Sequence, residues 1–225
     1  MAQAKAALVV GAGQGISGAV ATGLRDAGYR VAVAARDLDR LAAWAQPEGL
    51  VPLRTDVADA ASVKRLFADA DSAVGEPEVV LFNPSARVRG DLLSLDVDEV
   101  ARVVQVTALG AFATAQEAAR RMLPKGRGAI FFTGATAGVK GFARSSPFAM
   151  AKFALRGLAQ SLARELAPQG VHVAHFVIDG GVQPPGSGDD RFSPEAIAQT
   201  YLAVLRQPKG AWSWEVELRA NTEPF

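Results

Sequence analysis

The sequence predicts an α/β fold with a doubly wound parallel sheet, about seven strands in a single domain with helices on both faces. Short apolar runs alternate along the chain with longer stretches that have helical periodicity. The apolar runs lack polar alternation, which is typical of strands buried on both faces. Strands that alternate with helices pair in parallel, because each helix returns the chain to the same end of the sheet.

The expected strands are mostly continuous apolar runs, such as "KAALVV" near the start, whereas the last one, "AWSWEVELR", alternates. They cover residues 5–10, 30–35, 50–56, 78–83, 128–134, 171–179 and 211–219. The segments between them have helical periodicity. Helices are expected over residues 15–28, 38–45, 61–75, 96–123 as one long helix, from Ser145 toward the sixth strand, and 193–205.

Composition fits one globular domain over residues 1–225, with 49% hydrophobic and 21% charged residues. The net charge of +1 gives no reason to expect a nucleic-acid partner. The absence of cysteine excludes disulfides and thiolate chemistry and fits a reducing compartment. The first apolar run is too short for a signal peptide, and no stretch is long and uncharged enough to cross a membrane. We therefore expect a cytoplasmic protein without a membrane partner.

A glycine-rich turn, "VVGAGQGISGAV", follows the first strand and opens the first helix. Glycines allow a tight turn and close approach of the backbone to a ligand, and the N-terminus of the helix offers free N–H groups to a phosphate. The alternative is a turn that merely packs tightly. We predict a dinucleotide-binding turn made by Gly11, Gly13, Gln14, Gly15 and Ile16, with Gly18 in the helix behind it.

The second strand ends at Ala35, and Arg36 follows it. Proteins that bind NAD usually place an acid near this point to hold the ribose hydroxyls, whereas an arginine accommodates the 2′-phosphate of NADP. The sequence therefore favours NADP(H) over NAD(H). The alternative is that Arg36, which has Asp37 beside it, is only a solvated surface charge.

Further cofactor contacts are expected where the third and fourth strands end. Asp56 and Val57 follow the third strand, where a carboxylate can accept a hydrogen bond from an adenine amino group. Asn83 and Ala86 follow the fourth strand. A small residue there lets a dinucleotide lie flat against the edge of the sheet.

The helix after the fifth strand places Phe148 and Lys152 on one face, since they are four residues apart. A lysine beside a tyrosine would lower the pKa of the phenol and make it a usable proton donor. Phenylalanine has no proton to donate, so this pair retains the lysine without the acid.

Together these residues resemble the short-chain dehydrogenase/reductase family over nearly the whole chain. The T-G-x-x-x-G-x-G motif of the family matches at Gly11 and Gly15, with Val10 in place of threonine and Ser17 in place of the third glycine. Its N-N-A-G motif appears as "NPSA" at residues 83–86. The resemblance implies a Rossmann-type fold, a nicotinamide cofactor, and a small carbonyl or alcohol substrate.

The resemblance also implies where the catalytic side chains would lie. Members of the family use a tyrosine, a lysine, a serine and an asparagine, and these positions fall here on Phe148, Lys152, Ala135 and Thr107. The turn that shapes the nicotinamide pocket is Asp179-Gly180, so Gly180 is expected at the cofactor. Three of the four catalytic positions have therefore lost their chemistry, whereas most cofactor-side features are retained.

Another group could supply the proton. Asp179 is the best placed, because a carboxyl partly buried beside a nicotinamide could act as an acid. The alternative is that Asp179 caps the following turn. Hydroxyl groups flank the lost positions but are better explained as loop or cap residues, namely those of Thr133, Thr136, Ser145 and Ser146.

The remaining candidates are better explained by structure. His175 is expected in the core, His172 on the surface, and no metal site is expected. Trp212 and Trp214 are expected to pack or to lie in an interface. Residues 180–192 correspond to the substrate lid of the family and are short and polar here. The resemblance also implies a homodimer or homotetramer built on the last strand and the two long helices.

Three hypotheses follow. The first is an NADP(H)-dependent oxidoreductase acting on a carbonyl or alcohol through a non-standard active site, in which Phe148 and Ala135 replace tyrosine and serine. The second is a catalytically silent protein that binds NADP(H). The third is a degenerate partner subunit of an active relative.

Overall fold

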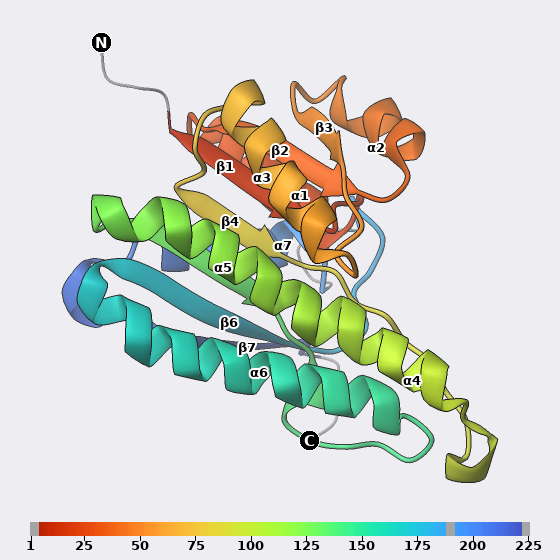
Figure 1. Ribbon diagram of the computed structural model, residues 1–225. Coiled ribbons are helices and arrows are strands. Elements are labelled where there is room, and N and C mark those ends of the chain that lie inside the picture. The colour runs from red at the N-terminus through yellow and green to blue at the C-terminus, as the bar shows by residue number, and fades with distance from the viewer. Residues whose placement is uncertain (1–4, 188–191, 222–225) are drawn as a thin grey trace.

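Seven strands form one parallel sheet in the order β3-β2-β1-β4-β5-β6-β7 (Figure 1). The computed structural model describes residues 5–187 and 192–221. The doubly wound parallel sheet predicted from the sequence is confirmed. The strands are β1 (Ala6–Val10), β2 (Arg30–Ala35), β3 (Val51–Arg54), β4 (Val79–Phe82), β5 (Gly128–Thr133), β6 (Val171–Asp179) and β7 (Glu215–Arg219).

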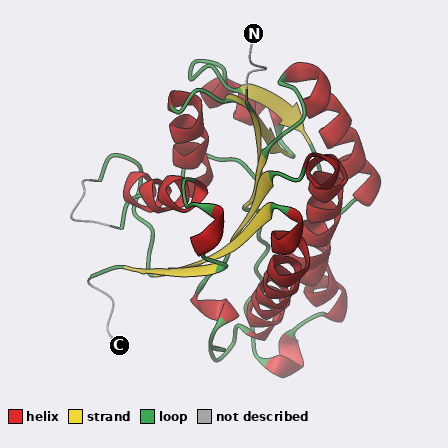
Figure 2. Cartoon of the chain, turned by 90° about the vertical axis from the view of Figure 1, so that its left-hand side faces the viewer, coloured by secondary structure: helices red, strands yellow, loops and turns green. Residues whose placement is uncertain are grey.

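Helices cover both faces of this sheet, which Figure 2 shows nearly edge-on between two helical layers. The side chains of the two core clusters assign each helix to a face. One layer holds α1 (Ile16–Asp26), α2 (Leu38–Ala45) and α7 (Pro194–Leu205). The other holds α3 (Ala60–Ala73), α5 (Gly110–Met122) and α6 (Ser146–Leu166), with α4 (Val97–Val104) directly before α5.

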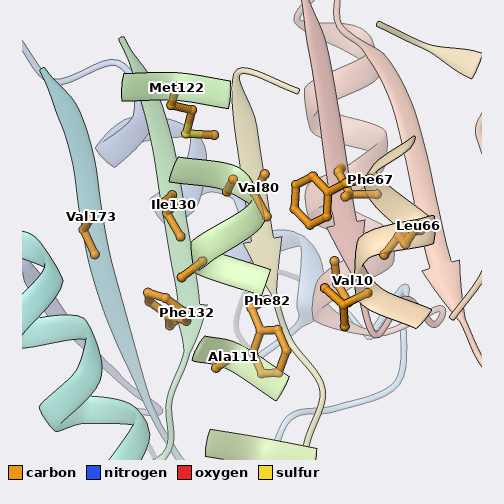
Figure 3. Packing of buried hydrophobic residues seen from close by; sticks show 14 of the residues in the cluster. Val10, Leu66, Phe67, Val80, Phe82, Ala111, Met122, Ile130, Phe132 and Val173 are labelled. Carbon is orange, nitrogen blue, oxygen red and sulfur yellow. The ribbon is translucent and has the colours of Figure 1, made fainter. Parts of the chain in front are cut away.

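The apolar strands divide their side chains between two cores. Along β1, Leu8 and Val10 pack into the cluster under α3, α5 and α6, whereas Ala7 and Val9 pack under α1, α2 and α7. Figure 3 shows the first cluster, where Phe67, Phe82 and Phe132 lie together with aliphatic side chains. Burial on both faces is the reason that these strands lack polar alternation.

Side-chain caps fix the starts of several helices. The Asp37 carboxylate accepts from the backbone N–H of Arg40 at 3.0 Å at the start of α2. Asp59 caps α3, Asp96 caps α4 and Ser193 caps α7 in the same way. The helix predicted at 193–205 therefore begins at Pro194, directly after its capping serine.

The long helix predicted over residues 96–123 is interrupted. A π-helical turn, Gln105–Leu109, separates α4 from α5. Two contacts with the loop after β3 accompany it. The Gln105 side-chain amide donates to the Ala58 carbonyl at 3.0 Å, and a Cβ on Gly110 would lie 2.8 Å from the Val57 carbonyl oxygen. A π turn often marks a functional site, and this one carries Thr107.

The last strand is shorter than predicted, because it begins at Glu215, although the Trp214 carbonyl still accepts from the His175 N–H of β6 at 2.8 Å. The side chains of residues 211–214 turn to the neighbouring β6 and to the loop after α7. Trp212 stacks on His172 with the ring centroids 4.7 Å apart, and its indole N–H donates to the Gln207 carbonyl at 3.1 Å. Trp214 packs against the first core cluster, so both tryptophans pack within the chain.

The prediction that His172 is exposed is wrong. The side chain is buried under the Trp212 ring, and its Nε2 lies 2.8 Å from the Ser213 carbonyl oxygen. Burial lowers the pKa of His172. The sequence held a signal for this burial, since a tryptophan just before the last strand can cover the start of the strand that pairs with it.

Two further observations bear on the sequence predictions. No helix in the described part of the chain is long and apolar enough to cross a membrane. Residues 188–191 of the predicted substrate loop, 180–192, lie outside the described residues.

We predict that Phe132→Ala lowers the free energy of unfolding by about 3–5 kcal/mol, because Phe132 is fully buried on β5 and the truncation leaves a cavity. Urea denaturation followed by circular dichroism measures this change. Phe132→Leu, which fills more of the space, should cost clearly less. Equal losses for the two variants would contradict the packing described for this cluster.

Candidate functional site

Adjoining hollows open at the carboxyl ends of the strands, where the strand order reverses between β1 and β4. A cavity of about 850 Å³ lies over the ends of β5 and β6 and the start of α6. A cleft of about 620 Å³ lies over the ends of β1, β2 and β3. The cavity and the cleft share Asn83, Ser85 and Arg87, so they form one continuous depression. A third hollow beside the cleft contains Gly13, Gln14 and Arg36.

The glycine turn leaves its backbone open to this depression. The N–H groups of Gly11 and Ala12 both donate to the Ala34 carbonyl, at 2.8 and 2.9 Å, which fixes the turn against β2. Gly11 has φ +74°, and a Cβ there would lie 2.6 Å from Pro84. By contrast, nothing lies within 4 Å of a Cβ built on Gly13 or Gly15, so the space above the turn can receive a ligand.

Ser17 and Gly18 complete the turn. The Ser17 hydroxyl oxygen accepts from the Gly13 N–H at 3.1 Å, which ties the turn to the first turn of α1. A Cβ on Gly18 would lie only 2.5 Å from the Gly13 carbonyl oxygen. Gly18 therefore allows the close packing of turn on helix, one position after the third glycine of the family motif.

Arg36 lies exposed on the rim of the cleft and of the third hollow. Its neighbour Asp37 lines the third hollow too, and its carboxylate accepts from the Arg40 N–H and caps α2. Among the described residues, no ion pair within 4 Å joins Asp37 to Arg36. The Asp56 carboxylate lies in the same cleft and accepts from the Ala58 N–H at 3.0 Å. Asp37 therefore has its own structural role, and Arg36 stays available to a ligand.

Asn83 and Thr107 brace the loop after β4. The Asn83 side-chain amide donates to the Gly11 carbonyl at 3.1 Å, which joins this loop to the glycine turn. Thr107 is fully buried in the π turn, and its hydroxyl oxygen accepts from the Ala86 N–H at 3.2 Å. Thr107 thus holds the backbone of the loop and does not line either hollow.

Lys152 contributes a buried amine to the cavity. Its ammonium donates to the Thr133 carbonyl at the end of β5, with Nζ and O 2.7 Å apart. No carboxylate among the described residues forms an ion pair with it within 4 Å. Burial lowers the pKa of Lys152 to about 7, and the charge of nearby Arg87 acts in the same direction.

Phe148 lies one helical turn from Lys152 and forms part of the cavity wall. The Lys152 Nζ is 5.9 Å from the centroid of its ring. The Arg87 guanidinium covers the same ring, with its central carbon 4.0 Å from the centroid. Phe148 is therefore a buried aromatic ring in contact range of two cationic side chains.

Two other predicted site residues have different environments. Ala135 lines the cavity and presents only a methyl group to it. Asp179 does not line the cavity. Its carboxylate accepts from the Thr136 hydroxyl at 2.5 Å and pairs with Arg219 on β7. These contacts hold the end of β6 against β7. Asp179 therefore has a structural role, which differs from the turn cap that was the alternative to a catalytic role.

His175 lies in the core behind the cavity, as expected. Its Nδ1 is 3.0 Å from Glu215, which also forms a two-point ion pair with Arg156 at 2.7 and 2.6 Å. Burial lowers the pKa of His175 to about 4, so the ring is neutral at physiological pH. Among the described residues, no group of three or more His, Asp or Glu side chains could hold a metal ion.

Sequence reasoning missed three arginines that line the cavity: Arg87, Arg89 and Arg144. The first two lie in "ARVRG", directly after the fourth strand, which is where ligand-contacting residues concentrate in this architecture. That position was a usable signal. Arg144 lies in the loop before α6 and pairs with Asp91, a contact that sequence spacing does not reveal.

The structure brings most of the predicted site residues to the depression. Lys152, Phe148, Ala135, Gly180 and Ile16 lie together on or around the cavity, with Asn83 between it and the cleft. The cleft and the third hollow contain the other predicted cofactor residues except Gly15, namely Gly11, Gly13, Gln14, Arg36, Asp56, Val57 and Ala86. A parallel sheet with an open glycine turn at its switch point is the arrangement of dinucleotide-binding α/β proteins.

Comparison with known proteins gives the family. A profile of the short chain dehydrogenase family matches residues 5–187. An uncharacterized oxidoreductase of Staphylococcus aureus (strain N315) is 29% identical over 223 residues, which cover 96% of each protein. The chain therefore belongs to the short-chain dehydrogenase/reductase family, a family of oxidoreductases.

Solved structures agree with this assignment. A short-chain dehydrogenase from Rhodopseudomonas palustris is 34% identical, with a TM-score of 0.85 over 95% of this chain and 98% of that one. A metagenomic short-chain oxidoreductase, solved in complex with NADP, is 25% identical, with a TM-score of 0.84 over 96% of this chain and 97% of that one.

We predict that Thr107→Val lowers the free energy of unfolding by about 1 kcal/mol or more, because the Ala86 N–H loses its acceptor. Chemical denaturation measures the loss. Thr114→Val is the matched control. Thr114 is equally buried, but its hydroxyl donates to a helical carbonyl, so no N–H loses its acceptor. A larger loss for the control would contradict the role assigned to Thr107.

Proposed function

We propose that this chain is an NADP(H)-dependent oxidoreductase that acts on a carbonyl or alcohol through a non-standard active site. The observation that carries the proposal is the buried Lys152 amine in a cavity that continues into the glycine-turn cleft. Members of the family use a tyrosine and a serine for catalysis, and Phe148 and Ala135 occupy those two positions here.

The chain fits a nicotinamide dinucleotide on its own geometry. The open space over Gly13 and Gly15 suits a diphosphate, which the N–H groups at the start of α1 would bind. The metagenomic relative binds NADP in its solved structure, which supports a cofactor of the same class. When bound, the cofactor supplies the hydride. Lys152 and Gly180 would border its nicotinamide end, and Asp56 its adenine end.

Arg36 supports NADP(H) over NAD(H). It is exposed on the rim of the cleft, and the preceding Ala35 offers no carboxylate to the ribose hydroxyls. A guanidinium can bind a 2′-phosphate through two parallel hydrogen bonds. The Asp37 carboxylate caps α2 and, among the described residues, forms no ion pair with Arg36 within 4 Å.

We predict that Arg36→Ala weakens NADPH binding at least about tenfold and leaves NADH binding nearly unchanged, because only NADPH carries the 2′-phosphate. Titration followed by nicotinamide fluorescence measures both affinities. Arg164→Ala, which removes an exposed arginine from the far end of α6, is the control for net charge. An unchanged NADPH affinity in Arg36→Ala would remove the basis for the preference.

Lys152 is also the best-placed proton source. Arginine side chains stay protonated at all relevant pH values, and Phe148 and Ala135 carry no proton to donate. Among the described residues that line the cavity, Lys152 alone combines a pKa near neutrality with a position beside the predicted nicotinamide site. A general acid works best when its pKa lies close to the working pH. In this proposal Lys152 takes over the proton donation that the family assigns to tyrosine.

This role predicts a pH dependence. Lys152 donates only when protonated, so kcat/KM for carbonyl reduction should fall as the pH rises above about 7, by about tenfold per unit. NMR of the protein with lysine labelled at Cε measures the pKa of each amine, and the signal that disappears in Lys152→Arg is that of Lys152. We expect its pKa near 7, well below the pKa values of the other lysines. A midpoint for Lys152 in the ordinary lysine range would contradict the assignment.

A silent NADP(H)-binding protein is the second candidate, and Phe148, Ala135 and Thr107 favour it. None of these side chains can perform the chemistry that the family places there. In that case NADPH would bind with the same Arg36 dependence, but no carbonyl compound would be reduced. A degenerate partner subunit would bind neither dinucleotide.

We also propose a homo-oligomer. Exposed apolar side chains on α5 and α6 support it, with Phe112 50% and Phe153 45% exposed. Light scattering should give a mass of two or four chains of 23.5 kDa, and Phe153→Glu should shift it toward one chain. A parent protein with the mass of one chain would contradict this proposal. The cytoplasmic location stays a prediction from the sequence.

A further inference from the structure

The cavity at the end of β5 and β6 carries an unusual balance of charge. Four cationic residues line it: Arg87, Arg89, Arg144 and Lys152. Among the described residues that line it, no aspartate or glutamate is present. Two carboxylates lie beside the lining without being part of it. Asp91 pairs with Arg144 at 3.2 Å, and Asp179 accepts from the Thr136 hydroxyl and pairs with Arg219.

Arg87 and Arg89 form no ion pair with a carboxylate of the described residues. Arg87 instead lies over the Phe148 ring, with its central carbon 4.0 Å from the centroid. Burial lowers the pKa of Arg87, and the charge of Arg89 acts in the same direction. The charge of Arg87 also disfavours the protonated form of Lys152. Arg87 thus lies close enough to two other cationic side chains, Arg89 and Lys152, for their charges to interact.

The three arginines are exposed and keep contact with solvent, whereas Lys152 is buried. Like charges that share a site repel, and for Lys152 the loss of solvation adds to the repulsion. Guanidinium groups are also the preferred partners of carboxylates and phosphates, because their N–H groups match two oxygen atoms at once. An anion in the cavity would relieve the repulsion and use donors that no carboxylate of the described residues occupies.

Arg89 and Arg144 line the cavity alone, whereas Arg87 lies where the cavity meets the cleft and lines both. Ile16, Lys152 and Gly180 mark the end where the nicotinamide is expected. Arg87 and Arg89 come from the loop after β4, and Arg144 comes from the loop before α6. The two loops are joined by the Arg144–Asp91 ion pair and by a hydrogen bond from the Gly90 N–H to the Arg144 carbonyl at 3.2 Å.

Arg144 is held in an uncommon backbone conformation at this junction. Its φ is +60°, and it is the one residue other than glycine with positive φ in the described part of the chain. Residues other than glycine adopt this region rarely, and such residues concentrate at ligand sites. The conformation is consistent with a loop whose shape serves the cavity.

We propose that the cavity binds a small molecule with an anionic group, a carboxylate or a phosphate, that Arg87 recognises with the help of Arg89. The inference rests on the proposed function, since it makes this molecule the carbonyl or alcohol substrate. The Phe148 ring lies against the guanidinium, with the central carbon of Arg87 4.0 Å from the ring centroid, and this contact holds Arg87 at the cavity.

The test compares an anion with its neutral counterpart. Levulinate and methyl levulinate share a ketone and differ in the carboxylate. Inorganic phosphate provides the second anion. Isothermal titration of each into the protein, with and without NADP, should show levulinate or phosphate binding at least about tenfold more tightly than the ester. The tighter of the two anions identifies the anionic group.

Variants then assign the interaction. Arg87→Gln should remove the preference for the anion, whereas Arg87→Lys, which keeps the charge but loses the two-point geometry, should retain part of it. Arg164→Gln lowers the net charge equally at a distant, exposed position and should have no effect. Equal binding of levulinate, phosphate and ester, no binding of either anion, or equal losses in Arg87→Gln and Arg164→Gln would each overturn the inference.

NADPH titration of the same preparations separates the two proposals. Arg87-dependent anion binding without NADPH binding would refute the proposed function and leave the anion site standing. NADPH binding with equal affinities for acid and ester would refute the anion site alone. If Arg87→Gln weakens NADPH binding but not anion binding, Arg87 contacts the cofactor and the inference fails.

Discussion

The strands β1, β2, β4, β5 and β6 carry apolar side chains toward helices on both faces, so polar groups are confined largely to the strand ends. This constraint determines where a ligand can bind. The glycine turn, Asn83 and the Thr133 carbonyl all lie where strands end, and they meet at the point where the strand order reverses. The site is therefore a consequence of how the sheet is buried.

Lys152 is the main polar exception to the apolar interior on α6. Its amine is buried, donates to the Thr133 carbonyl, and has no ion-pair partner among the described residues. Burying an amine without a carboxylate lowers its pKa, which costs stability in the protonated form. A chain that had lost all use for the site would gain by replacing this lysine with an apolar residue. Its presence favours a retained role in binding or proton transfer.

The order and type of the elements could be predicted from the sequence because apolar runs and helical periodicity report burial directly. The strand bounds 30–35 and 171–179 match the structure. The π turn at Gln105–Leu109 could not be predicted, since it accompanies contacts with a loop some 50 residues earlier in the chain, where Gly110 lies against Val57. The late start of β7, at Glu215, likewise accompanies a contact that spacing does not reveal, the stacking of Trp212 on His172.

The cofactor side of the candidate site was more predictable than the substrate side. Glycines that follow a strand have a local signature, and the positions of Gly11, Arg36 and Asn83 follow from the strand ends. The structural role of Asp179 depends on Arg219, which lies on a different strand, and the stacking of Arg87 on Phe148 depends on two elements far apart in the sequence. Contacts of this kind follow from the packed structure and not from spacing.

The central claim is that the site can still transfer a hydride without a tyrosine. The most direct measurement is to incubate the protein with NADPH that is deuterated at the transferable position, together with a mixture of carbonyl compounds with and without anionic groups. Mass spectrometry of the products then detects the label. We predict deuterium in an alcohol that bears an anionic group. Transfer by Phe148→Tyr/Ala135→Ser but none by the parent protein would contradict the claim and identify a silenced site.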